Sequence, residues 1–347
     1  MESNSSISSE TTSAVPNITI GHSSPANMDT SSLLLTKHMT WAKTILLFVA
    51  VLLGVFGNVM IIIIVRRFRA ASSSSAMDPY FMVLAVTDLC VVITGSFLVW
   101  IQSATGFHMR RTHDVVCKSV VFMLNVGAAC SAWILVAMTT QRAVSVAWPH
   151  RVNVLCTSRR SWWTILTIVV FFCLVYSHML YGIGIVPSAG HSCTLVSKSY
   201  ELFLRNVWLK IDILLFSFLP FACLFLSNSV LVLKLRRSLK DAREQLTTTD
   251  TQHANREKNA SSITLTAIVV SLVFIVLTFP LALYNLLSLV AANTRYTDDI
   301  NLSFFFRQVV YITAYFNYSV NVYLYCLTGE RFRMKFREIM CGCVVQS

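Results

Sequence analysis

The stretch TILLFVAVLLGVFGNVMIIIIV, residues 44–65, contains no charged side chain and is followed at once by the basic run Arg66-Arg67-Phe68-Arg69. A helix of about 20 apolar residues crosses the roughly 30 Å of hydrocarbon in a bilayer, so this stretch predicts a membrane-spanning helix. The later blocks are too long for barrel strands and lack two-residue alternation. We therefore predict an all-α membrane protein, a seven-transmembrane helix bundle. Its other blocks are residues 79–101, 115–138, 162–186, 207–233, 263–290 and 304–327.

The composition of the 347 residues agrees with a membrane protein, since 55% are hydrophobic and only 13% are charged. Soluble proteins have about 25% charged residues, and a disordered chain would need low hydrophobicity. Ten cysteines are too few for a small disulfide scaffold. The net charge of +12 suggests nucleic acid, but the basic residues flank the apolar blocks. We expect a lipid membrane as the partner and no nucleic acid.

Basic residues also predict the orientation, because cytoplasmic loops carry an excess of Lys and Arg. If the N-terminus is extracellular, such clusters follow the first, third, fifth and seventh spans on the cytoplasmic side. We expect three parts: a disordered extracellular tail at residues 1–40, the bundle at 41–327, and an inner helix with a short tail at 328–347. The Ser-rich outer tail lacks a signal peptide and carries glycosylation sequons at Asn4 and Asn17.

The short inner segment alternates basic with apolar residues, as in Arg331-Phe332-Arg333-Met334. This pattern predicts an amphipathic helix along the inner membrane surface, with a plain solvated tail as the alternative. Cys341 and Cys343 follow as palmitoylation candidates. The threonines at 247–249 and 251 are candidates for regulatory phosphorylation, or else linker residues.

Several polar residues lie inside the apolar blocks, where burying them is costly and marks functional candidates. Asp88 lies near the middle of its span, and no basic residue is present at that depth. The alternative is that these groups only hydrogen-bond one helix to another. The neutral members of the set are Asn58, Ser131, Asn317 and Asn321.

The order and spacing of several short motifs resemble the rhodopsin-like (class A) G protein-coupled receptors over about residues 41–343. The motifs are Gly57-Asn58-Val59, Leu84-Ala85 with Asp88, Cys117 with Arg142, Pro149, Pro220, Phe274 with Pro280, and Asn321-Val322-Tyr323-Leu324-Tyr325. The resemblance implies a Cys117–Cys193 disulfide. It also implies a sodium site that collapses on activation, formed by Asp88, Ser131, Asn317 and Asn321. No other cofactor is implied. It assigns an activation switch to Asn58, Gln141, Arg142, Phe274, Thr278, Pro280 and Tyr325.

The chain departs from the family pattern at several of these positions. Gln141 replaces the acidic residue before Arg142, so we expect a weaker restraint on that arginine and higher basal signalling. Val322 replaces the helix-seven proline, so we expect the end of that helix to be straighter or re-aimed. The remaining departures are Ala143 for a tyrosine, Thr278 for an aromatic residue, and Trp162 and Trp163 near the inner end of helix four, whose middle lacks the usual tryptophan.

The outer half of the bundle contains the residues expected to choose the ligand. Leu124 occupies the position where amine receptors carry an aspartate, and helix seven lacks the retinal-binding lysine of opsins, so both ligand types are disfavoured. Asp212 and Lys210 would meet peptide charges or lie at the headgroup level. The expected mix of aromatic, amide and charged groups favours a peptide. The expected cavity residues are Gln102, Leu124, Asn125, Ala128, Asp212, Asn285, Arg307, Tyr311 and Tyr315.

Residues 146–157 look like the second inner loop of invertebrate neuropeptide receptors. The leading hypothesis is therefore a plasma-membrane receptor for a short neuropeptide that activates heterotrimeric G proteins and also binds arrestin. A chemosensory or other small-molecule receptor of the same fold is the alternative. A transporter would predict internal repeats or paired broken helices, and the sequence shows neither. An enzyme is disfavoured because metal-ligand spacing, a nucleotide loop and a nucleophile elbow are all missing.

Overall fold

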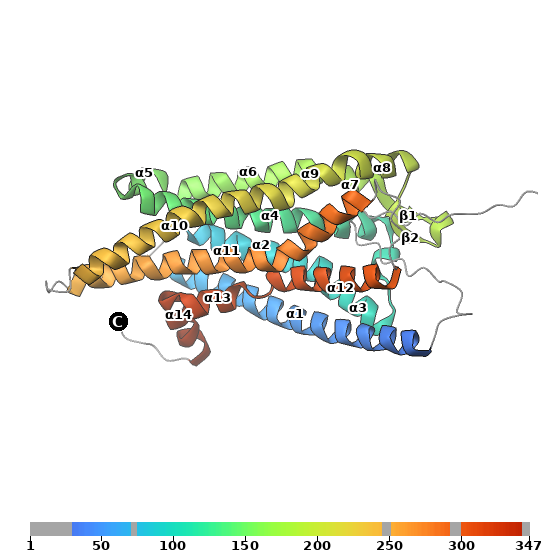
Figure 1. The fold of residues 1–347 in the computed structure, drawn as a ribbon, viewed down its shortest axis with the longest axis horizontal. Coiled ribbons are helices and arrows are strands. Elements are labelled where there is room, and N and C mark those ends of the chain that lie inside the picture. The colour runs from blue at the N-terminus through green and yellow to red at the C-terminus, as the bar shows by residue number, and fades with distance from the viewer. Residues whose placement is uncertain (1–29, 71–74, 245–250, 292–299, 342–347) are drawn as a thin grey trace, which may run out of the picture.

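The computed structural model describes residues 30–70, 75–244, 251–291 and 300–341, and it forms an elongated bundle of roughly aligned helices (Figure 1). In the described part of the chain, six helical segments are long and apolar enough to cross a membrane. They are Lys37–Arg67, Asp78–Thr105, Asp114–Ala147, Ser158–Gly182, Lys198–Arg237 and Thr264–Leu289. The seventh span is divided into two shorter helices, α12 and α13. The bundle therefore has the predicted architecture.

The second, fourth, fifth and sixth spans pack around the long third span, whose buried positions include Cys117, Ser131 and Ile134. Large apolar side chains such as Leu174 on the fourth span remain exposed on the outside of the bundle, where lipid would cover them. The elements are α1 (Thr30–Ala70), α2 (Asp78–Val91), α3 (Leu98–Thr105), α4 (Asp114–Ala147), α5 (Val152–Leu155), α6 (Ser158–Tyr176) and α7 (His178–Gly182).

The fifth to seventh spans complete the bundle and end in a short helix at the inner end. The elements are α8 (Lys198–Phe203), α9 (Leu209–Asp212), α10 (Leu219–Glu244), α11 (Thr251–Ala291), α12 (Ile300–Asn317), α13 (Asn321–Thr328) and α14 (Glu330–Cys341). Three π-helical segments interrupt spans two and five, at Val92–Phe97, Leu204–Trp208 and Ile213–Phe218. Such segments are frequent at functional sites, and here two of them adjoin the cavity described below.

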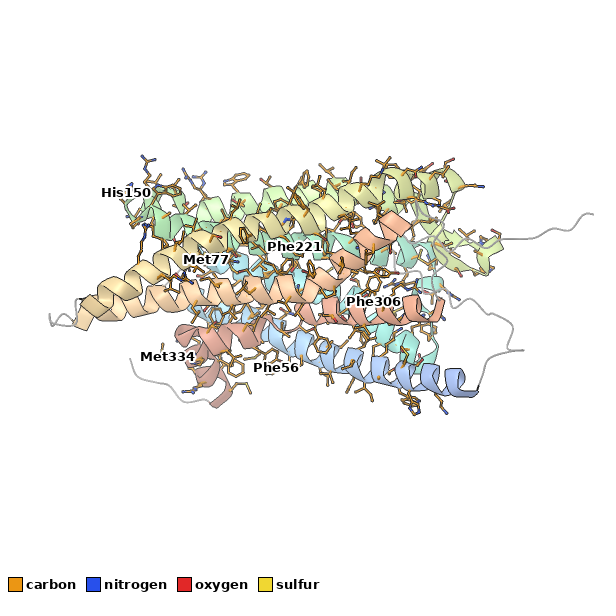
Figure 2. All side chains as sticks on the ribbon, in the orientation of Figure 1. Phe56, Met77, His150, Phe221, Phe306 and Met334 are labelled. Atoms are coloured by element: carbon orange, nitrogen blue, oxygen red, sulfur yellow. A yellow bond between two sulfur atoms is a disulfide. The ribbon has the colours of Figure 1, made fainter. Side chains whose placement is uncertain are left out.

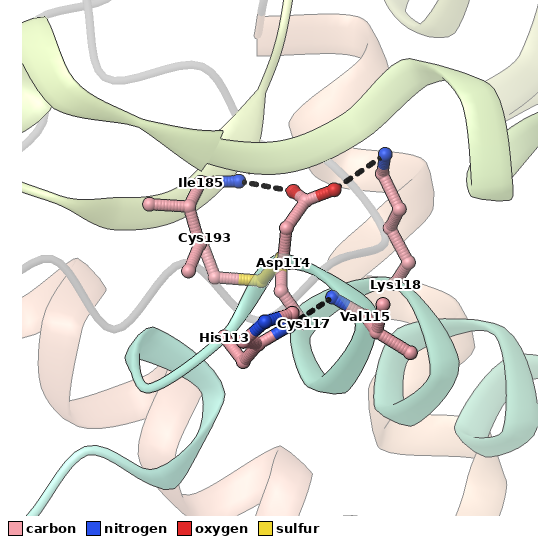
Figure 3. Close-up of polar contacts among 7 residues, drawn as sticks. All are labelled: His113, Asp114, Val115, Cys117, Lys118, Ile185 and Cys193. Atoms are coloured by element: carbon pink, nitrogen blue, oxygen red, sulfur yellow. Dashed lines mark hydrogen bonds and ion pairs between the residues drawn. A yellow bond between two sulfur atoms is a disulfide. The ribbon is translucent and has the colours of Figure 1, made fainter.

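A hairpin of β1 (Ile183–Val186) and β2 (Ser192–Leu195) covers the outer end of the third span. The strands are antiparallel, with Ile185 opposite Cys193. The predicted Cys117–Cys193 disulfide is present, with the two Cα atoms 5.7 Å apart. Asp114 accepts a hydrogen bond of 2.9 Å from the backbone N–H of Ile185 and pairs with Lys118 at 2.6 Å (Figure 3). The hairpin is therefore attached to the start of α4 by a covalent bond and a charged side chain.

The seventh span is interrupted, so Val322 in place of proline does not straighten it, and the alternative expectation of a re-aimed end stays a prediction. The regular helix stops at Asn317 and resumes at Asn321. Within the break, the Tyr318 and Ser319 N–H groups donate to carbonyls three residues back, at 3.2 and 3.0 Å. These tight turns replace the four-residue spacing of an α-helix.

Helix one supplies the groups that stabilise this break. Asn58 Nδ2 donates 2.8 Å to the Tyr318 carbonyl, and Ser319 Oγ donates 2.8 Å to the Ala50 carbonyl. In an uninterrupted helix the Tyr318 carbonyl would accept from the N–H of Val322. A side chain of α1 thus satisfies a backbone carbonyl of the seventh span that is no longer bonded within its own helix. The break therefore forms without a proline.

The predicted amphipathic helix is present as α14, at the inner end of the bundle (Figure 2, where Met334 is labelled). Phe332 packs against Phe81 and Tyr325, with ring centroids 5.1 and 5.4 Å apart. Phe336 and Ile339 pack on the same core, whereas Met334 is exposed. The predicted modification sites lie outside the described residues or side chains: Asn4, Asn17, Cys341, Cys343 and the threonines at 247–249 and 251. Helix α1 begins at Thr30, so it includes residues 30–40 of the predicted tail.

Candidate functional site

A cavity that is partly open to solvent lies among the second to seventh spans. On α4 its residues lie two to three turns from Cys117, which places the cavity in the outer half of the bundle. Its lining is Val91, Leu124, Asn125, Ala128, Tyr176, Asp212, Phe216, Leu281, Asn285, Tyr311, Ala314, Tyr315 and Tyr318. The structure brings together every residue expected from the sequence except Gln102 and Arg307.

The sequence reasoning missed six lining residues. Most are one helical turn from a residue that it did predict: Phe216 follows Asp212 and Leu281 precedes Asn285 at four-residue spacing. Extending each predicted position by one turn would have found Phe216, Leu281, Ala314 and Tyr318. Val91 lies three turns from Gln102, the residue predicted on its span, and no cavity residue was predicted on the span of Tyr176, so only the folded arrangement identifies these two.

Asp212 is the charged side chain among the lining residues, and it is only 7% exposed. The Tyr176 hydroxyl donates a 2.7 Å hydrogen bond to its Oδ1 atom. Lys210, two residues earlier, is exposed on the outside of the helix. Asp212 therefore places a carboxylate in the cavity wall, whereas Lys210 lies where a lipid headgroup or solvent would meet it.

Deeper in the bundle, the carboxylate of Asp88 is fully buried. Its Oδ1 accepts a 2.5 Å hydrogen bond from Ser131 Oγ, and its Oδ2 accepts a 2.6 Å bond from Asn321 Nδ2. Of the four residues expected at the sodium site, the structure thus joins Asp88, Ser131 and Asn321 by hydrogen bonds. Asn317 is also buried, one turn earlier on helix seven, but none of its described hydrogen bonds reaches Asp88.

The Asp88 site fits a small hard cation better than it fits a salt bridge. The described ion pairs are Lys118–Asp114 and Lys335–Glu338, so no described basic side chain neutralises Asp88. Asn58 Oδ1 is a further buried oxygen, on the residue bonded to Tyr318, and it accepts no described hydrogen bond. One carboxylate with several neutral oxygens is a donor set that suits a hard cation.

At the inner end of the third span, Gln141 is hydrogen-bonded to α6, the helix of the fourth span. Its Oε1 accepts from Ser161 Oγ at 3.2 Å, and Ser161 also donates to the Ala76 carbonyl at 2.7 Å. Burial raises the pKa of the nearby Cys156 thiol, and the positive charge of Arg142 opposes that effect. The neutral Gln141 thus connects α4 to α6, and Ser161 in turn contacts the turn before α2.

The remaining switch residues lie in the core of the bundle. Phe274 is buried and meets Phe221 edge-on at 6.2 Å, between α10 and α11 (Figure 2). Thr278 Oγ1 donates 2.6 Å to the Phe274 carbonyl, and Pro280 lies inside the continuous α11. Tyr325 is fully buried against Phe81, with ring centroids 5.0 Å apart.

Comparison with known proteins identifies the family. Residues 57–325 match the model of the 7 transmembrane receptor (rhodopsin family). The chain is 24% identical to the thyrotropin-releasing hormone receptor of Bos taurus over 310 residues, covering 84% of this chain and 75% of that relative.

Two further relatives have different names but similar coverage. The type-1 angiotensin II receptor B of Xenopus laevis is 22% identical over 296 residues, or 83% of this chain and 76% of the relative. The C-C chemokine receptor type 9 of Homo sapiens is 23% identical over 316 residues, or 85% and 76%. The matched family consists of receptors and not of enzymes. The family match spans most of the helical bundle, and this chain belongs to the rhodopsin family of seven-transmembrane receptors.

Proposed function

We propose that this chain is a plasma-membrane receptor, with its N-terminus outside, that binds a short peptide and activates a heterotrimeric G protein. The observation that carries the proposal is the outer cavity, where the carboxylate of Asp212, the amides of Asn125 and Asn285, and four tyrosines converge. Backbone amides and side chains of a peptide would supply partners for each of these groups. The relatives named for thyrotropin-releasing hormone and angiotensin II support the same ligand class.

The proposal includes a bound sodium ion in the resting receptor. Asp88 and Ser131 would hold the ion, with Asn317 and Asn321 completing the site. A ligand that prefers one conformation shifts the equilibrium toward it, so sodium held only in the resting state would oppose agonists.

The proposal is tested by expressing the receptor with sensors of G protein dissociation and applying a library of short peptides, both amidated and with free C-termini. We expect at least one peptide to activate a G protein. Asp212→Asn should lower its potency about tenfold, whereas the exposed matched change Lys210→Gln should leave the potency unchanged. Activation by small organic molecules and by no peptide would overturn the ligand class, and activation by no ligand of either kind would count against G protein coupling.

A further inference from the structure

Arg110 comes from the outer loop between α3 and α4, in the short helical turn Met109–Arg111. Its side chain points into the bundle, where Nη2 donates a 3.2 Å hydrogen bond to the Thr94 carbonyl. Thr94 is itself only 8% exposed and lies in the π-helical segment Val92–Phe97. A guanidinium group is thus inserted between the outer ends of the helices instead of extending into solvent.

The positive charge at this position has no described anionic partner. Neither of the two described ion pairs involves Arg110. Burial lowers the pKa of its guanidinium, and the Tyr315 phenol opposes that effect. A guanidinium has five N–H donors, of which one is used in a described hydrogen bond. Arg110 is half-buried, and none of its nitrogens is among the described buried atoms that lack a hydrogen bond. Its remaining donors are therefore accessible to solvent or to an anion.

The guanidinium lies beside the ligand cavity. Tyr315, which interacts electrostatically with Arg110, is a lining residue. Gly95 follows Thr94 directly, and a Cβ atom on Gly95 would lie 2.7 Å from the Tyr315 ring and 2.9 Å from Leu124 Cδ1. Arg110 is not itself a lining residue, but it is bonded to Thr94, next to Gly95, which adjoins the lining residues Leu124 and Tyr315. The negative side chain of the lining, Asp212, is contributed by the fifth span.

We propose that Arg110 binds a carboxylate group of the ligand. The planar guanidinium pairs with a carboxylate through two parallel hydrogen bonds, which supplies the missing charge and uses the remaining donors. This inference rests on the proposed peptide receptor and narrows its ligand class to short peptides with an acidic side chain or a free C-terminus. The competing role is structural, in which Arg110 only satisfies the Thr94 carbonyl.

The charge of the cavity can be measured without knowing the ligand. A cysteine at position 124 (Leu124→Cys) would be treated with the anionic sulfonatoethyl and the cationic trimethylammonioethyl methanethiosulfonates, and the two modification rates compared. The ratio of rates cancels changes in thiol reactivity, and the parent receptor corrects for native cysteines. We expect Arg110→Gln to lower the anionic-to-cationic ratio about tenfold. Arg110→Lys should keep the ratio, because it keeps the charge.

The Arg110→Gln change is the matched control for the structural role, since its amide can still donate to the Thr94 carbonyl. An unchanged ratio in that variant would overturn the proposal. If the variant fails to reach the membrane, two reporters in the otherwise intact receptor still test it. The anionic-to-cationic ratio of modification rates should be higher for Leu124→Cys than for Phe216→Cys, which lies one turn from Asp212. Equal ratios at the two positions would overturn the proposal.

Peptide agonists provide the second arm. Matched peptides that differ only in a carboxylate or its amide would be compared on the wild type and on Arg110→Gln. We expect the acid to be at least tenfold more potent than the amide on the wild type and equally potent on the variant. An agonist that needs no carboxylate would overturn the inference while supporting the proposed function. Failure of every peptide would count against the proposed function, and the reagent ratios would still decide the role of Arg110.

Discussion

In the sixth and seventh membrane spans, the span that contains a proline is not the span that is broken. The sixth span contains Pro280, yet it forms the continuous helix α11. The seventh span has Val322 where the family pattern has proline, and it is nevertheless broken between Asn317 and Asn321. Proline removes one hydrogen bond, and membrane helices tolerate it when neighbouring groups satisfy the freed backbone. Hydrogen bonds from other helices, and not the local residue alone, therefore decide where these spans break.

The break has a functional consequence because it determines where Asn321 lies. Asn321 is the first residue of α13, and its Nδ2 donates to the buried carboxylate of Asp88. Resuming the helix after a three-residue turn sets the rotation of α13 relative to α12. The Asn58–Tyr318 bond on one side and the Asn321–Asp88 bond on the other thus connect helix seven to helices one and two.

Asn58→Ala should have the largest effect, because it removes the amide that binds the Tyr318 carbonyl in the break. Asn58 also donates to the Gly54 carbonyl and is 1% exposed, so no water replaces it readily. We expect the free energy of unfolding to fall by about 2 kcal/mol. Thermal unfolding of the purified receptor would measure this. Thr313→Ala, which removes only a bond to Val309 within the same helix, is the control and should change little. Equal stability of Asn58→Ala and wild type would show that the break does not depend on helix one.

Sodium should stabilise the wild type and not Asp88→Asn. A ligand that binds only the folded receptor adds about 1.4 kcal/mol when its concentration is ten times its dissociation constant. Asparagine keeps the shape of the side chain and removes the negative charge that a cation needs. The measurement is the melting temperature in sodium chloride against the same concentration of choline chloride. A sodium response of the same size in both proteins would exclude the site at Asp88.

Gln141→Glu restores the acidic residue that the family pattern has before Arg142. The new carboxylate can still accept from Ser161, and it adds a negative charge next to Arg142. A charge-assisted hydrogen bond contributes roughly 1 kcal/mol more than a neutral one, so agonist-free signalling should fall about fivefold at equal surface expression. Gln141→Ala, which loses the Ser161 bond without adding charge, should not show this fall. Basal signalling that rises or stays constant in Gln141→Glu would contradict the prediction.

The sequence predicted the features that depend on local composition or on a family motif. Hydrophobic blocks gave the spans, and the motif spacing gave the disulfide and the contacts of Asp88 with Ser131 and Asn321. It did not predict the break in helix seven, because Asn58 and Tyr318 lie far apart along the chain. It also missed the bond from Tyr176 to Asp212 and the inward position of Arg110. Each of these arises from tertiary hydrogen bonds, which override the local pattern.

Val322→Pro should have the smallest effect, although a proline inside a helix costs about 3 kcal/mol or more. Val322 is the second residue of α13, and the first N–H groups of a helix have no intrahelical partner. The ring therefore removes no α-helical bond here, and its restricted φ suits a helix start. Val322 is 2% exposed and packs beside Gly57, so some packing is lost, and we expect destabilisation of less than about 1 kcal/mol.

The matched control is Leu272→Pro, at a half-exposed site in the continuous α11, where no side-chain packing compensates. That variant should lose about 3 kcal/mol. Similar losses in the two variants would mean that Val322 belongs to an intact helix, and that the turn at residues 318–320 does not interrupt the span.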